Sequence, residues 1–170
     1  GALPINYIKF EKFLCKNEKI VGASCRDALS NKKININSKS IINASGSWTD
    51  EVLNEKTKKL ILSKGIHIVI PSEKFPLKQS IYFDAIDDRM IFAIPRNKII
   101  YIGTTDTVFD RKKDNLRVFK KEVKYLIDSV NKSFTVKINE NDILSSWVGI
   151  RPLIKEKNKH VTEISRKDEI

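Results

Sequence analysis

Short hydrophobic runs separated by polar turns recur along the chain, and this spacing favours β-strands. The turns carry the usual polar residues, as at Asp87-Asp88 and at Arg96-Asn97. Successive strands joined by such short links form antiparallel meanders. The pattern predicts strands over 5–14, 19–27, 33–43, 66–70, 79–84, 90–94, 98–103 and 146–153.

A first helix is expected where the opening meander ends. Thr49 is its predicted N-cap, followed by Asp50 and Glu51 in the first turn, where the helix dipole favours carboxylates. The helix is predicted to run to Ser63 and to be stopped by Gly65. The residues expected on its buried face are Val52, Leu53, Leu60 and Ile61.

A second, amphipathic helix is predicted over 115–131. Meanders combined with helices indicate an α+β fold, with a mixed, largely antiparallel sheet and two main helices. The hydrophobic residues at helical spacing in this segment are Leu116, Phe119, Val123, Leu126, Ile127 and Val130.

Composition excludes some classes of protein. The chain has 170 residues, a formal net charge of +11, 41% hydrophobic residues and 31% charged residues, which is typical of a folded domain. No hydrophobic run approaches the ~18 residues of a membrane span. Of the 32 basic residues 25 are lysines, and they are scattered without the aromatic residues that stack bases. A non-catalytic module that binds nucleic acid is therefore only a distant alternative.

The two cysteines are too few to form a disulfide framework. Cys15 and Cys25 lie in hydrophobic, strand-like stretches and are expected to be buried free thiols, which suits a reducing compartment. With only two histidines beside them, no four-ligand zinc set exists, so no metal site is expected.

Two polar residues interrupt otherwise hydrophobic strands. His67, in the run IHIVI, is either a core histidine or a titratable imidazole that faces a cleft. Arg151, in SWVGIRPLI, must either form an internal ion pair or bind an anion. His160 and Arg166 are surface residues by default, and residues 103–106 resemble a turn or cap.

Several longer motifs, taken together and in order, resemble the FAD-dependent glycerol-3-phosphate dehydrogenase family, which are flavoproteins of the D-amino-acid-oxidase type. The resemblance covers essentially the whole chain, with mild departures at Ser45, where Thr is commoner, and at Ser47, where Pro is common. The motifs are NASGSW at 43–48, KGIHIVIP at 64–71, DRMIFAIPRNKIIYIGTTDT at 88–107, SSWVGIRPLI at 145–154 and ISRKDEI at 164–170.

The resemblance implies roles for particular residues. His67 matches the histidine of the family's K-G-x-H strand, which implies that it is the base that takes the substrate's hydroxyl proton. Arg151 and Arg166 match two arginines directed at the substrate and its phosphate. The residues that match the family's N-A-T-G-x-W motif, which passes beside the flavin, are Asn43, Ala44, Ser45, Gly46 and Trp48.

The resemblance also implies a domain organisation. Residues 1–48 are expected to be terminal strands of an FAD-binding domain, 49–163 a substrate-binding α+β domain, and 164–170 the start of a segment that returns to the FAD domain. The N-terminal dinucleotide fold is expected to precede Gly1 and the closing segment to follow Ile170. The chain alone is thus expected to be an inactive fragment without a complete FAD-binding site.

The implied activity of the full-length protein is oxidation of sn-glycerol 3-phosphate to dihydroxyacetone phosphate. Hydride passes to FAD, and a quinone is the expected electron acceptor; the alternative is a glycerol-3-phosphate oxidase that uses oxygen. The protein is expected to be cytoplasmic and peripheral to the inner face of the membrane. These residues leave open both the acceptor and whether the protein forms a homo-oligomer.

Overall fold

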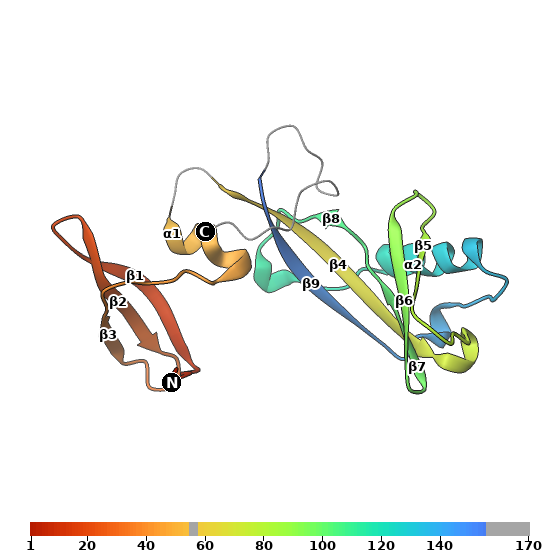
Figure 1. Ribbon diagram of the computed structural model, residues 1–170, viewed down its shortest axis with the longest axis horizontal. Coiled ribbons are helices and arrows are strands. Elements are labelled where there is room, and N and C mark those ends of the chain that lie inside the picture. The colour runs from red at the N-terminus through yellow and green to blue at the C-terminus, as the bar shows by residue number, and fades with distance from the viewer. Residues whose placement is uncertain (55–57, 156–170) are drawn as a thin grey trace. The chain divides into compact units, whose positions relative to one another are not determined.

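The computed structural model describes residues 1–54 and 58–155, apart from the side chain of Asp114 (Figure 1). The chain divides into two compact units, Gly1–Lys58 and Lys59–Ile170. Both contain antiparallel sheets accompanied by helix, which confirms the predicted α+β class. The assignment of 1–48 to an FAD-binding domain stays a prediction.

The first unit is built on a sheet of strands in the order β1-β2-β3. Both strand pairs are antiparallel, as a meander requires. Strand β3 is shorter than predicted and ends before residue 43. The strands are β1 (Ile8–Lys16), β2 (Lys19–Asp27) and β3 (Lys33–Asn37).

The cysteines of this sheet differ in exposure. Cys25 is buried, as expected, and burial is the main cause that raises the pKa of its thiol. Cys15 is exposed, so the prediction that it is buried is wrong. The cause is its position near the end of the β1–β2 pair, where Cys15 lies opposite Ile20 beside an irregularity in the strand register.

The first helix is much shorter than predicted. After the 3-10 turn η1 (Gly46–Trp48), helix α1 covers only Thr49–Leu53, with Trp48 rather than Thr49 at its N-cap. Asn54 ends the helix in the left-handed conformation, with a φ of 52°. Hydrophobic spacing alone did not reveal this stop.

Leu60 and Ile61 belong to strand β4 (Leu60–Pro71) and not to a helix. The reason is pairing with strand β9 (Ser145–Ile154), whose register runs from Leu60 opposite Ile154 to Val69 opposite Ser145. Gly65 lies inside β4 and ends no helix. Backbone hydrogen bonds to β9 stabilise the strand more than the weak local preference for helix stabilises a helix.

Strand β4 is central to the sheet of the second unit. The order is β5-β6-β7-β4-β8, and β9 also pairs with β4. The predicted turns at Asp88 and Asn97 are confirmed, since both residues have positive φ. The short strand β8 was not predicted. The further strands are β5 (Ile81–Asp84), β6 (Met90–Arg96), β7 (Ile99–Gly103) and β8 (Thr107–Val108).

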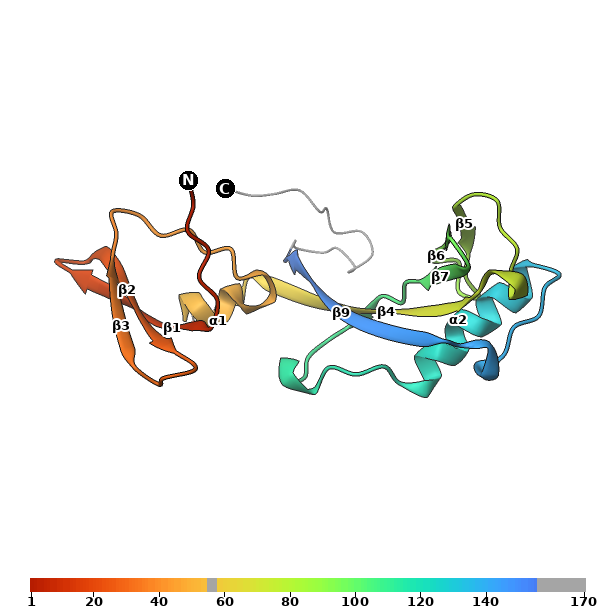
Figure 2. The same ribbon diagram turned by 90° about the horizontal axis from the view of Figure 1, so that it is seen from below.

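Helix α2 (Lys120–Ser133) lies along one face of this sheet (Figure 2). It begins later than predicted because the Glu122 carboxylate accepts the Phe119 backbone N–H at 2.9 Å, which makes Phe119 the N-cap. Leu126 and Val130 are fully buried on its inner side. The remaining short turns are η2 (Ser72–Lys74), η3 (Lys113–Asn115) and η4 (Glu140–Asp142).

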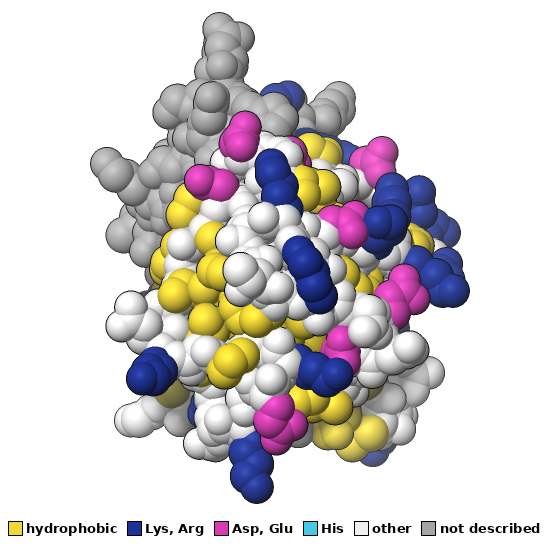
Figure 3. All heavy atoms as spheres, turned by 90° about the vertical axis from the view of Figure 1, so that its right-hand side faces the viewer, with side chains coloured by type: hydrophobic (Ala, Val, Ile, Leu, Met, Phe, Trp, Pro, Cys, Tyr) yellow, Lys and Arg dark blue, Asp and Glu magenta, His cyan; other side chains and the backbone are white. Residues whose placement is uncertain are grey.

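Alternation along β4 gives the sheet two different faces. Ile66, Ile68 and Ile70 are fully buried and belong to the hydrophobic core with α2. Gly65 and His67 alternate with these isoleucines along the strand. They therefore lie on the opposite face of the sheet, as strand geometry requires. In the view of Figure 3, from the right-hand side of Figure 1, the lysines and arginines are scattered among acidic and hydrophobic side chains and form no continuous stripe.

Candidate functional site

The register between β4 and β9 places the candidate residues on one strand face. His67 lies opposite Trp147, Gly65 opposite Gly149, and Ser63 opposite Arg151. Residues directly opposite each other in an antiparallel pair share a face, and alternate residues of each strand do so too. His67 and Arg151 therefore lie on the same face, with a pair of glycines between them.

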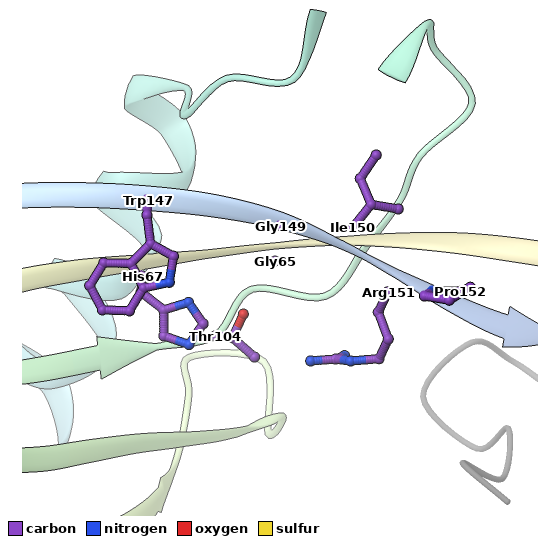
Figure 4. Close-up of a pocket in the computed structure, with 8 residues that line it drawn as sticks. All are labelled: Gly65, His67, Thr104, Trp147, Gly149, Ile150, Arg151 and Pro152. Atoms are coloured by element: carbon purple, nitrogen blue, oxygen red, sulfur yellow. The ribbon is translucent and has the colours of Figure 1, made fainter. Parts of the chain in front are cut away.

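A pocket of about 340 Å³ opens on this face. Figure 4 shows the Arg151 side chain extending from β9 back toward His67, so that both residues are directed at the same space. The resemblance implies that His67, Arg151 and Arg166 face one substrate; the structure brings the first two together, and Arg166 lies outside the described residues. The pocket is lined by Gly65, His67, Thr104, Trp147, Gly149, Ile150, Arg151 and Pro152.

Aromatic rings hold the imidazole of His67 in place. The Trp147 ring stacks on it with centroids 4.8 Å apart and planes 10° apart, and the Phe92 ring lies at 5.4 Å. A Cβ at Gly103 would lie 2.3 Å from His67 Cδ2, so only glycine fits opposite the imidazole. These contacts restrict the ring to a narrow set of orientations.

The surroundings of His67 favour its neutral form. Burial lowers the pKa of the imidazole below its ordinary value of 6.5, and the positive charge of Arg151 lowers it further. Nδ1 is buried and has no hydrogen-bond partner in the described part of the chain. A neutral imidazole can accept a proton at neutral pH.

Arg151 combines the two roles that the sequence left as alternatives. Its Nη1 donates to Asp106 Oδ1 at 3.3 Å, and its side chain also lines the pocket. The Arg151 side chain is 32% exposed, so the guanidinium is open to a bound ligand as well as to Asp106. A guanidinium is suited to phosphate or carboxylate because its donors form a planar fork.

Asp106 is a part of the site that the sequence did not reveal, since residues 103–106 resembled a turn. Its carboxylate accepts hydrogen bonds from Arg151 and from the Ser63 hydroxyl. Its backbone carbonyl accepts from Arg89 Nη1 at 2.7 Å. Both Arg151 and Asp106 also line a neighbouring pocket of about 450 Å³. Asp106 thus fixes the position of the Arg151 guanidinium between two pockets.

Thr104 and Trp147 were also missed. Trp147 shares the alternation of Gly149 and Arg151 along β9, so strand periodicity could have placed it on the same face. For Asp106 and Thr104 the sequence offers no such signal, because their positions depend on the pairing of β4 with β7 and β8.

The predicted flavin-side residues form a compact loop in the first unit. Asn43 Oδ1 accepts from the Ser45 backbone N–H at 3.2 Å and from the Ser45 hydroxyl at 2.6 Å. Gly46 has a φ of +55°, which favours glycine, and Ala44 and Trp48 are exposed. The role of this loop beside a flavin stays a prediction.

Other predicted features can be placed only in part. Arg166 and His160 lie outside the described residues. Within the ranges 1–54 and 58–155, no group of three or more His, Cys, Asp or Glu residues could hold a metal ion. Over the same ranges, no helix is both long enough and apolar enough to cross a membrane.

Comparison with known proteins identifies the family. The model of the FAD dependent oxidoreductase family matches residues 13–168, and the chain belongs to this family. Over its whole length it is 47% identical to the aerobic glycerol-3-phosphate dehydrogenases of Staphylococcus aureus strains MRSA252 and COL. The chain spans 32% of the length of these relatives.

A solved structure supports the same relationship. The glycerol-3-phosphate dehydrogenase of Bacillus halodurans, solved in complex with FAD, superimposes on the chain with a TM-score of 0.82 and 39% identity. The superposition covers 91% of this chain and 32% of the other. The fold and the family agree with those implied by the sequence motifs.

Proposed function

We propose that the chain is the substrate-side part of a longer FAD-dependent enzyme that oxidises sn-glycerol 3-phosphate to dihydroxyacetone phosphate. The observation that carries the proposal is that His67 and Arg151 line one pocket. The surroundings of the His67 imidazole favour its neutral form. The names of the similar dehydrogenases agree with this substrate.

In this reaction Arg151 binds the phosphate of the substrate. A phosphate dianion needs several donors and a compensating charge, and the guanidinium supplies both. Asp106 holds Arg151 through Nη1, which fixes the direction in which the remaining donors face. We assign Arg166 as a second cation for the same phosphate, because it matches the family's second arginine.

His67 takes the proton of the secondary hydroxyl. Since Nδ1 is covered, we assign Nε2 as the nitrogen that accepts it. The hydroxyl proton is transferred to His67 as the O–H bond breaks. The C2 hydrogen leaves as hydride, and the C2–O bond becomes a carbonyl. Neutral imidazole is required for this step, and burial together with Arg151 maintains it.

The described residues fit the substrate side of an FAD site. The Trp147 ring gives the pocket an aromatic surface that is 42% exposed. The space beside Gly149 is empty, since a Cβ built there would meet no atom within 4 Å. When bound, FAD supplies the hydride acceptor. We assign the loop from Asn43 to Trp48 to the neighbourhood of the flavin, where its small residues allow close backbone approach.

For the electron acceptor we propose a membrane quinone, with the enzyme cytoplasmic and peripheral to the inner face of the membrane. The word "aerobic" in the names of the relatives supports a respiratory role. The oxidase alternative gives a different product, because oxygen as acceptor releases hydrogen peroxide.

The test is reduction of the flavin by the substrate without oxygen. The whole FAD-loaded enzyme is mixed anaerobically with glycerol 3-phosphate, and loss of flavin absorbance is followed together with dihydroxyacetone phosphate. We expect bleaching with an equivalent amount of product. A flavin that stays oxidised would refute the proposal. Reoxidation of the bleached enzyme by a quinone analogue, without hydrogen peroxide on exposure to air, would separate a dehydrogenase from an oxidase.

A further inference from the structure

Gly149 lies in the interior of β9, where glycine is unfavourable. Glycine in a strand loses more conformational entropy on folding than other residues and contributes no packing. Its φ lies outside the left-handed region, and a Cβ built there meets no heavy atom within 4 Å. Neither backbone conformation nor crowding by the described residues therefore requires glycine at this position.

The other glycines of the site differ in this respect. A Cβ at Gly65 would lie 2.3 Å from Thr104 Oγ1, and one at Gly103 would lie 2.3 Å from His67 Cδ2. Contacts within the protein explain both of these glycines. At Gly149 the space is open and belongs to the pocket.

The position of Gly149 indicates what the open space is for. It lies opposite Gly65, between the His67–Trp147 pair and the Ser63–Arg151 pair. With a strand rise of about 3.3 Å per residue, it is about 7 Å along β9 from either Trp147 or Arg151. A small ligand that contacts both the imidazole and the guanidinium therefore has open space over Gly149.

We propose that Gly149 determines substrate specificity by leaving room for the carbon chain of the substrate. This rests on the proposed function, in which His67 meets the hydroxyl and Arg151 the phosphate. The chain that joins these two groups then lies over the open backbone of Gly149, because Thr104 Oγ1 already covers Gly65. The substrate class that fits is a short, unbranched hydroxyalkyl phosphate, and a side chain at position 149 occupies the same space.

The experiment compares Gly149→Ala with wild type in the whole FAD-loaded enzyme. Ser146→Ala is the control, since Ser146 lies exposed on the same strand but outside the pocket. We expect Gly149→Ala to raise the KM for glycerol 3-phosphate about tenfold or more, a normal effect of one misplaced methyl group in a substrate pocket. The FAD content and competitive inhibition by inorganic phosphate should stay at wild-type levels, because phosphate alone needs only the Arg151 end.

Four results with the Gly149→Ala variant would overturn the inference. An unchanged KM would show that the space is not used by the substrate, and loss of FAD would show that the flavin occupies it. Phosphate inhibition weakened in parallel with substrate binding would place the effect at Arg151. A variant that does not fold would contradict the open space itself. A wild-type enzyme inactive on glycerol 3-phosphate would instead overturn the proposed function, and the inference with it.

Discussion

In the proposed reaction, His67 and Arg151 have complementary electrostatic requirements. A base must lack its proton, whereas a phosphate site must be positive. The Arg151 charge serves both needs, because it attracts an anion and also helps to lower the pKa of His67. Asp106 pairs with Arg151 only through Nη1, at 3.3 Å, so it orients the guanidinium without occupying the whole of it.

Replacing the base should slow the chemical step. We expect His67→Asn to lower kcat by about 100-fold or more, as is usual when a general base is removed, with a much smaller change in KM. Steady-state kinetics of the whole enzyme at saturating substrate measure this. Normal flavin content is the control, and an unchanged kcat/KM would remove the role assigned to His67.

The pH dependence tests the coupling between the two residues. In the wild type we expect kcat/KM to rise with pH through an apparent pKa below 6.5, since the base must be neutral. In Arg151→Met the imidazolium loses an unfavourable positive neighbour, so its pKa rises and the inflection moves to higher pH. The same variant should bind substrate far more weakly. A KM near the wild-type value, or an inflection at the wild-type pH, would contradict the account.

Side-chain pattern revealed some of these residues and not others. His67 and Arg151 were identifiable because each interrupts a hydrophobic strand, and motif resemblance then gave them roles. Asp106 was not identifiable, because its contacts with Ser63 and Arg151 join segments that are far apart in the sequence.

At the scale of elements, a buried ion pair connects β4 to α2. Lys64 Nζ lies 2.7 Å and 2.8 Å from the two carboxylate oxygens of Glu122, and both side chains are less than a tenth exposed. Lys64 Nζ also lies 4.2 Å from the centroid of the Phe119 ring. Since Glu122 also caps α2, this cluster fixes the start of the helix against the strand that carries His67.

Breaking this pair should be costly. We expect Lys64→Met to lower the free energy of unfolding by about 3–5 kcal/mol, because it leaves the Glu122 carboxylate buried without its partner. The matched control is Lys124→Met, since Lys124 pairs with Asp128 at 2.7 Å but is 70% exposed, and its loss should cost below about 0.5 kcal/mol. Urea unfolding of the whole protein measures both, and equal effects would contradict the buried pair's role.

Elements with local signals could be predicted from the sequence, and those set by distant pairing could not. Strands β5, β6 and β7 have hydrophobic runs bounded by turn residues, so their positions were predicted closely. The first four residues of β4 were mistaken for helix because the partner strand β9 lies far along the chain. The start of α2 depends on the capping carboxylate of Glu122, which hydrophobic spacing does not reveal.

At the scale of the whole molecule, the chain supplies one side of a larger flavoenzyme site in our proposal. It spans about a third of the length of its curated relatives, and its pocket opens on the face of the sheet opposite α2. Within the described residues, no glycine-rich turn leads into a helix of the kind that binds a dinucleotide pyrophosphate. In our proposal, this chain binds the substrate and removes its proton, and FAD carries out the redox chemistry.

The central claim is that His67 and Arg151 act on one small phosphorylated alcohol. The most direct measurement is a crystal structure of the whole FAD-loaded enzyme with glycerol 3-phosphate bound. The account predicts the C2 hydroxyl within about 2.6–3.2 Å of the His67 imidazole and the phosphate hydrogen-bonded to Arg151, with the carbon chain over Gly149. A phosphate bound elsewhere, or a hydroxyl out of reach of His67, would contradict it.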